Sequence, residues 1–79
     1  MSKDQIIELV RRYAQVEEPV ELSIEVLDQG VRTEGGWWYV PVRTLADLPK
    51  RFPYYEKLAD IEEHLRQDEN LDVLLVPAG

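Results

Sequence analysis

Residues 35–43 read Gly-Gly-Trp-Trp-Tyr-Val-Pro-Val-Arg, and this stretch does most to decide the fold. The two adjacent glycines favour a tight turn, because glycine adopts positive φ at little steric cost. The following residues, 37–43, are rich in aromatic and β-branched side chains and predict a strand. Successive side chains of a strand alternate between its faces. One face therefore carries Trp38, Val40 and Val42, and the other carries Trp37, Tyr39, Pro41 and Arg43.

The valines are expected to face the core, which leaves Trp37 and Tyr39 on the opposite side of the sheet. Proline cannot donate a ladder hydrogen bond, so Pro41 predicts that this strand is an edge or is bulged there. Before the turn, residues 20–27 alternate apolar and polar side chains and predict an antiparallel partner strand. Residues 28–30, Asp-Gln-Gly, are a turn or a bulge, beyond which residues 31–33 continue that strand.

Two helices flank this hairpin. Ser2 and Gln5 match a capping box, and apolar residues then recur at helical spacing, which predicts a helix over about residues 3–17 that ends before Pro19. The second helix is expected from Pro53 to about Glu69, with Asn70 as a left-handed stop. Its apolar stripe consists of Tyr54, Leu58, Ile61 and Leu65.

A third strand is expected at residues 71–76, whose nearly continuous apolar character indicates burial on both faces. A right-handed crossover through the second helix would make it parallel to the strand at 37–43. The sequence therefore predicts one α+β domain over residues 1–79. The predicted fold is a two-layer αββαβ sandwich with a three-stranded mixed sheet and both helices on one face.

Composition narrows the function. The chain has 79 residues, no cysteine and a net charge of −7. A chain this short has a marginal core, so a homodimer is plausible from size alone. The acidic balance disfavours broad contact with a nucleic-acid backbone. No signal peptide or apolar span of membrane length is visible, so we expect a cytoplasmic protein without membrane contact.

Catalysis is not expected. The chain has one histidine, no glycine-rich phosphate loop and no spacing that brings a hydroxyl to that histidine. We therefore predict no cofactor. A ridge of metal-ligating residue types occurs on the second helix at steps of four, formed by Glu56, Asp60, His64 and Asp68. Because charged outer faces are usual on amphipathic helices, we interpret this ridge as a solvated face and predict no metal site.

Residues 32–57 are the exception to the acidity. They carry five bases against three acids and six of the seven aromatic residues. The candidate binding residues are Trp37, Tyr39, Arg43, Lys50, Arg51 and Tyr55. Trp, Tyr and Arg are enriched at interface hot spots, so the main hypothesis is a non-enzymatic interaction module that binds a protein partner or a second copy of itself.

Three alternatives stay open at this point. The same rings and bases could stack on and neutralise single-stranded RNA or a nucleotide. The acidic helices could instead mimic nucleic acid and bind a basic protein. Finally, Trp37 and Tyr39 could simply be covered by the chain itself, under residues 44–53.

Overall fold

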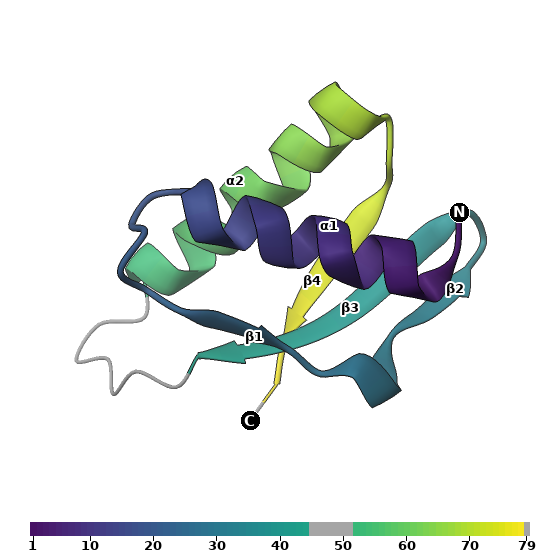
Figure 1. Cartoon of the computed structure of the whole chain (residues 1–79), viewed down its shortest axis with the longest axis horizontal. Coiled ribbons are helices and arrows are strands. Elements are labelled where there is room, and N and C mark those ends of the chain that lie inside the picture. Colours follow the sequence, from purple (N-terminus) through teal and green to yellow (C-terminus); the bar gives the residue numbers. More distant parts are fainter. Residues whose placement is uncertain (45–51, 79) are drawn as a thin grey trace.

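The computed structural model describes residues 1–44 and 52–78 (Figure 1). Helices α1 (Lys3–Val16) and α2 (Phe52–Glu69) pack on one side of a mixed sheet. The strands are β1 (Ile24–Val26), β2 (Arg32–Glu34), β3 (Trp37–Thr44) and β4 (Val73–Pro77), and a short 3-10 helix, η1 (Asp28–Gly30), separates β1 from β2. This arrangement confirms the predicted two-layer α+β fold, with the first strand split in two.

The signals at the helix ends are confirmed. The Ser2 hydroxyl accepts from the Gln5 amide at 3.3 Å, and the Gln5 side chain accepts from the Ser2 amide at 2.8 Å, which is the reciprocal pair of a capping box. Asn70 has a φ of 55° directly after α2, as a left-handed stop requires. Local chemistry therefore sets where both helices begin or end.

The central strand is β3, and the prediction that Pro41 marks an edge is wrong. Strand β3 pairs antiparallel with β1 and β2 along one side and parallel with β4 along the other. Strand β3 itself is not bulged either, because the extra residues belong to the partner strand, where residues 28–30 were expected to form a turn or a bulge. Between the pairs Val26–Val42 and Arg32–Tyr39, residues 27–31 lie opposite only residues 40–41 of β3.

Helix η1 fills that bulge, so the residue without an N–H lies where the ladder is interrupted. A Cβ added to Gly30 would stand 2.5 Å from Cγ of Pro41, closer than two carbons can approach. The glycine is therefore required by contact with the proline ring, and the bulge and Pro41 are fitted to each other.

The first predicted strand is also shorter than expected. Residues 19–22 form a turn in which the Leu22 amide donates to the Pro19 carbonyl at 3.1 Å. The ammonium group of Lys57, a fully buried residue of α2, donates to the same Pro19 oxygen at 2.8 Å and to the Leu22 oxygen at 2.7 Å. Alternating polarity at residues 20–23 therefore reflects a turn anchored by α2, not a strand.

The core lies between the helices and the facing side of the sheet. The predicted stripe of α2 is buried there, and Trp38 packs against its margin. The core residues are Ile6, Ile7, Val10, Ala14, Leu22, Val26, Val31, Val40, Val42, Tyr54, Leu58, Ile61, Leu65, Val73 and Leu75. The prediction that β4 is buried on both faces is wrong, because both helices cover the same side and Leu74 and Val76 remain exposed on the other.

Candidate interaction face

The side of the sheet opposite the helices carries aligned rows of side chains, and we call it the open face. Its apolar members are Trp37, Tyr39, Pro41, Leu74 and Val76, and its charged members are Glu25, Arg32, Glu34 and Arg43. In the middle row, Tyr39 is paired with Arg32 on one side and with Leu74 on the other. The next row sets Pro41 beside Val76. The apolar side chains thus form a strip along β3 and β4.

This strip is accessible to solvent. Trp37 is 40% exposed, Leu74 41% and Val76 38%, while Tyr39 and Pro41 are half-buried beside them. A sheet with one face in water usually alternates apolar side chains inward with polar ones outward. Strand β4 breaks that rule, because its outward side chains are aliphatic.

Charged side chains of both signs border the strip. The Arg43 guanidinium lies 2.9 Å from a carboxylate oxygen of Glu25, its directly paired neighbour on β1. Arg32 lies over the ring of Tyr39, 5.1 Å from the ring centroid, in a cation–π arrangement. With Glu34 included, the strands present two bases and two acids on this face, so the strand charges balance within a chain of net charge −7.

Three of the predicted binding residues are brought together here, namely Trp37, Tyr39 and Arg43. Tyr55 lies instead on α2, in the other layer, where it is 47% exposed and its ring is 5.5 Å from that of Tyr54. Lys50 and Arg51 lie outside the described residues. The face therefore draws its described members from strands alone.

The predicted binding residues did not include Arg32, Leu74 or Val76, although Arg32 was counted among the bases near the aromatic rings. Leu74 and Val76 alternate with Val73 and Leu75, so their sharing of a face was readable. The sequence did not show which of the two sets faces the helices, because both sets are aliphatic. Arg32 reaches the open face only because the η1 bulge shifts the register of β2 against β3.

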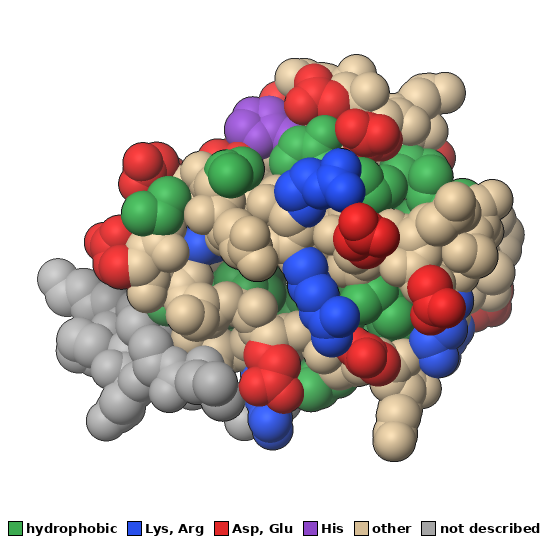
Figure 2. Space-filling model, viewed as in Figure 1, with side chains coloured by type: hydrophobic (Ala, Val, Ile, Leu, Met, Phe, Trp, Pro, Cys, Tyr) green, Lys and Arg blue, Asp and Glu red, His purple; other side chains and the backbone are tan. Residues whose placement is uncertain are grey.

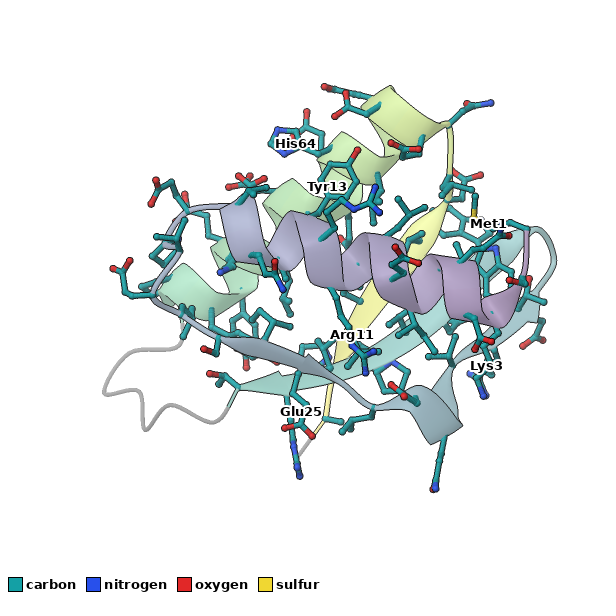
Figure 3. The ribbon with its side chains drawn as sticks, in the orientation of Figure 1. Met1, Lys3, Arg11, Tyr13, Glu25 and His64 are labelled. Carbon is teal, nitrogen blue, oxygen red and sulfur yellow. The ribbon has the colours of Figure 1, made fainter. Side chains whose placement is uncertain are left out.

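Two residues of the candidate metal ridge on α2, His64 and Asp68, contact residues of α1 or its C-cap. Nδ1 of His64 lies 2.5 Å from an oxygen of Glu17 at the end of α1. The Tyr13 hydroxyl of α1 donates to Glu69 at 2.8 Å and lies 3.5 Å from Asp68, and the Glu69 hydrogen bond is the main cause that raises the pKa of Tyr13 to about 12 (Figure 3). His64 and Asp68 therefore help to join the helices, which corrects the interpretation of a purely solvated ridge. Within residues 1–44 and 52–78, no three metal-ligating side chains are grouped.

Neither α1 nor α2 is apolar over a length that could cross a membrane. Comparisons with protein-family models, with curated proteins and with solved structures found no match for this chain. What the open face does must therefore be inferred from its own chemistry.

Proposed function

We propose that this chain is a non-enzymatic interaction module that self-associates by packing its open face against that of a second copy. The observation that carries this proposal is the apolar strip of Trp37, Tyr39, Leu74 and Val76, which is accessible on the side of the sheet that α1 and α2 leave uncovered. A contiguous apolar patch with a polar border has the composition of a protein interface. Packing the sheets of two copies against each other would bury the open face of both.

Electrostatics favours a second copy as the occupant. Two chains that each carry −7 repel one another, and much of that charge lies on the helix side, where acidic side chains are scattered over α1 and α2 (Figure 2). The strand charges of the open face balance, so two copies that meet there experience little repulsion between their strands. Its arginine and glutamate side chains can also pair across a two-fold axis, because a two-fold interface places each patch against its own copy.

Size supports the same conclusion. A standard interface buries roughly 800 Å² on each partner, which is about 15% of the 5254 Å² that this chain exposes. One broad face of a chain measuring 35 × 25 × 18 Å can supply that area. Burial of this strip would also add to a core that is small in a chain of this length.

The test is light scattering with size-exclusion chromatography over a wide range of concentration. The wild-type chain is expected to dimerise, and Trp37→Glu is expected to remain monomeric at the same concentrations because it buries a charge in the interface. Val16→Glu is the matched control, since Val16 is 67% exposed on α1 and the charge change is identical. Circular dichroism and thermal melting establish that both variants fold. A monomeric wild type, or a Trp37→Glu variant that dimerises normally, would refute the proposal.

Binding of single-stranded RNA through the same rings has less support. Arg43 is already paired with Glu25, and Arg32 covers the face of Tyr39 on which a base would stack. The carboxylates of Glu25 and Glu34 share the surface with these arginines and repel phosphate. A gel shift with a mixed-sequence oligonucleotide at low salt is expected to show no complex.

A further inference from the structure

The two outer edges of the sheet are finished in different ways. At the β4 edge, the Trp38 amide donates to the Asp72 carbonyl at 2.9 Å, so alternate residues beginning with Asp72 turn their backbone toward β3. Leu75 therefore turns its amide outward, where it donates to a carboxylate oxygen of Glu62 at 2.7 Å. Pro77 also turns its backbone away from β3, and as a proline it has no N–H to donate. Two successive outward positions of this edge, Leu75 and Pro77, therefore offer no free donor, and native edge strands are commonly protected in this way.

Among the residues that the structure describes, no side chain bonds to the outward amides of β1. The Leu27 amide donates to the Pro41 carbonyl at 2.9 Å, so Glu25 and Leu27 turn their backbone groups toward β3. The alternate residues Ile24 and Val26 therefore turn their N–H and C=O groups away from β3. Among the described residues, β3 is the only strand that pairs with β1. The outward backbone groups of β1 are therefore positioned to pair with an added strand.

A groove runs along this edge, with α1 as its other wall. It encloses about 460 Å³ between Arg11, Ala14 and Gln15 of α1 and residues 20 and 23–26, and a second recess of about 490 Å³ continues along residues 25–29. These volumes are typical of ligand sites, at roughly 300–1,000 Å³. Apolar side chains are visible in the hollow between α1 and β1 (Figure 2), and Arg11 points from α1 toward this strand (Figure 3).

We propose that this groove binds an extended segment of a partner protein, added as a strand to β1, with an apolar–basic–apolar sequence. The outward N–H and C=O groups of Ile24 and Val26 are spaced two residues apart, which matches the backbone of an extended chain. Side chains of the segment that point toward α1 meet Ala14 and Val20, which calls for apolar residues.

The intervening side chain of the segment points to the other side of the sheet, beside Glu25. One carboxylate oxygen of Glu25 is already bonded to Arg43 at 2.9 Å, and a lysine of the segment would contact the other oxygen, because opposite charges stabilise a cross-strand pair. The net charge of −7 attracts a basic segment over a longer range. A second copy of β1 is disfavoured in the aligned antiparallel register, because that register sets Glu25 against its own counterpart.

The probe is a synthetic peptide of sequence Thr-Val-Lys-Val-Thr, blocked at both ends and titrated into the ¹⁵N-labelled chain. The amide signals of Ile24 and Val26 are expected to shift and to exchange more slowly with solvent. The same peptide with Glu in place of Lys is expected to bind about two- to thirtyfold more weakly, since it replaces an attractive cross-strand pair with a repulsive one. Gln15→Trp, which fills the groove from α1, is expected to abolish the shifts, and Glu8→Trp, on α1 away from the groove, is the matched control.

Three results would overturn the proposal. The first is that no shift occurs at Ile24 and Val26 up to millimolar peptide. The second is that the shifts gather instead around Trp37 and Leu74 on the open face, or beside Glu62. The third is that the amides of β1 are protected without peptide in proportion to protein concentration, which would identify a second copy as the occupant. None of these results depends on whether the open face forms a dimer, because Trp37→Glu provides a monomeric background for the same titration.

Discussion

Replacing Lys57 with methionine is expected to destabilise the fold by about 3 kcal/mol. Lys57 is the one charged side chain that is fully buried among the described residues, and its ammonium group donates to the carbonyls of Pro19 and Leu22 at 2.8 and 2.7 Å. Methionine keeps the aliphatic stem and removes the donor. The loop between α1 and β1 then loses its attachment to α2.

The magnitude follows from these two bonds. A hydrogen bond from a charged donor contributes about 1.5–3 kcal/mol, so the gross loss is about 3–6 kcal/mol. Part of this loss is offset in the variant, because it no longer buries a charge. Burial disfavours the charged form of Lys57 and lowers its pKa. A net loss of about 3 kcal/mol corresponds to a fall in Tm of about 12–24 °C for a domain of this size.

Urea unfolding monitored by circular dichroism and tryptophan fluorescence measures the difference. Lys3→Met is the matched control, since Lys3 is an exposed residue of α1 and the substitution is expected to change stability by no more than about 0.5 kcal/mol. A Lys57→Met chain within about 0.5 kcal/mol of wild type would refute this reasoning. A more stable variant would also refute it, because apolar packing would then outweigh both bonds.

The stability difference between the wild type and Lys57→Met should depend on pH in a definite direction. Because the pKa of Lys57 is lowered in the folded chain, the unfolded chain binds that proton more tightly in the range just below its ordinary value of 10.5. The wild type should therefore gain stability relative to Lys57→Met as the pH rises through that range.

Other substitutions test separate contacts. The wild type should lose stability as the pH rises from 10 to about 12, because the pKa of Tyr13 is 10.0 in the unfolded chain and about 12 in the folded one. Tyr13→Phe should not show this loss, and an identical pH profile for both chains in urea titrations would contradict the prediction. Glu62→Gln should stabilise the chain at neutral pH, because burial raises the pKa of Glu62 and the amide oxygen still accepts from Leu75. The advantage of Glu62→Gln over wild type should shrink as the pH falls toward 4.5, and a constant advantage would show that the charge is not its cause. Glu62→Ala should expose the Leu75 amide and promote association through β4 in sedimentation runs; a variant that sediments like wild type would disprove this role. Gly30→Ala should cost about 1–3 kcal/mol by crowding Pro41, and adding Pro41→Ala should recover part of that loss in thermal melts; no recovery would place the strain elsewhere.

Much of the candidate face was predictable from the sequence. The parity of residues 37–43 placed Trp37, Tyr39 and Arg43 on the side away from the valines, and the structure agrees. That inference needed only the alternation of a strand and the preference of valine for a core. Lys57 was not foreseen as a core residue, because a lysine on a charged helix normally remains in water.

The aliphatic side chains of β4 show where such reasoning stops. A run of apolar residues identifies a strand and its two sets of side chains, but burial depends on how many layers cover the sheet. Both helices pack on one side, so Leu74 and Val76 join the open face. The position of Pro41 is a similar case, because the η1 bulge allows a proline in a central strand.

The sequence by itself determined the order of elements, the capping box at Ser2, the glycine turn, the stop at Asn70 and the alternation of β3. Each of these rests on interactions between residues a few positions apart, which sequence spacing expresses directly. The tertiary structure alone decided which strand is central, which face is bare, that Lys57 is buried, and that one sheet edge is blocked while the other borders a groove. These features arise from contacts between residues far apart in the chain, where the packing of whole elements, and not local preference, sets the free energy.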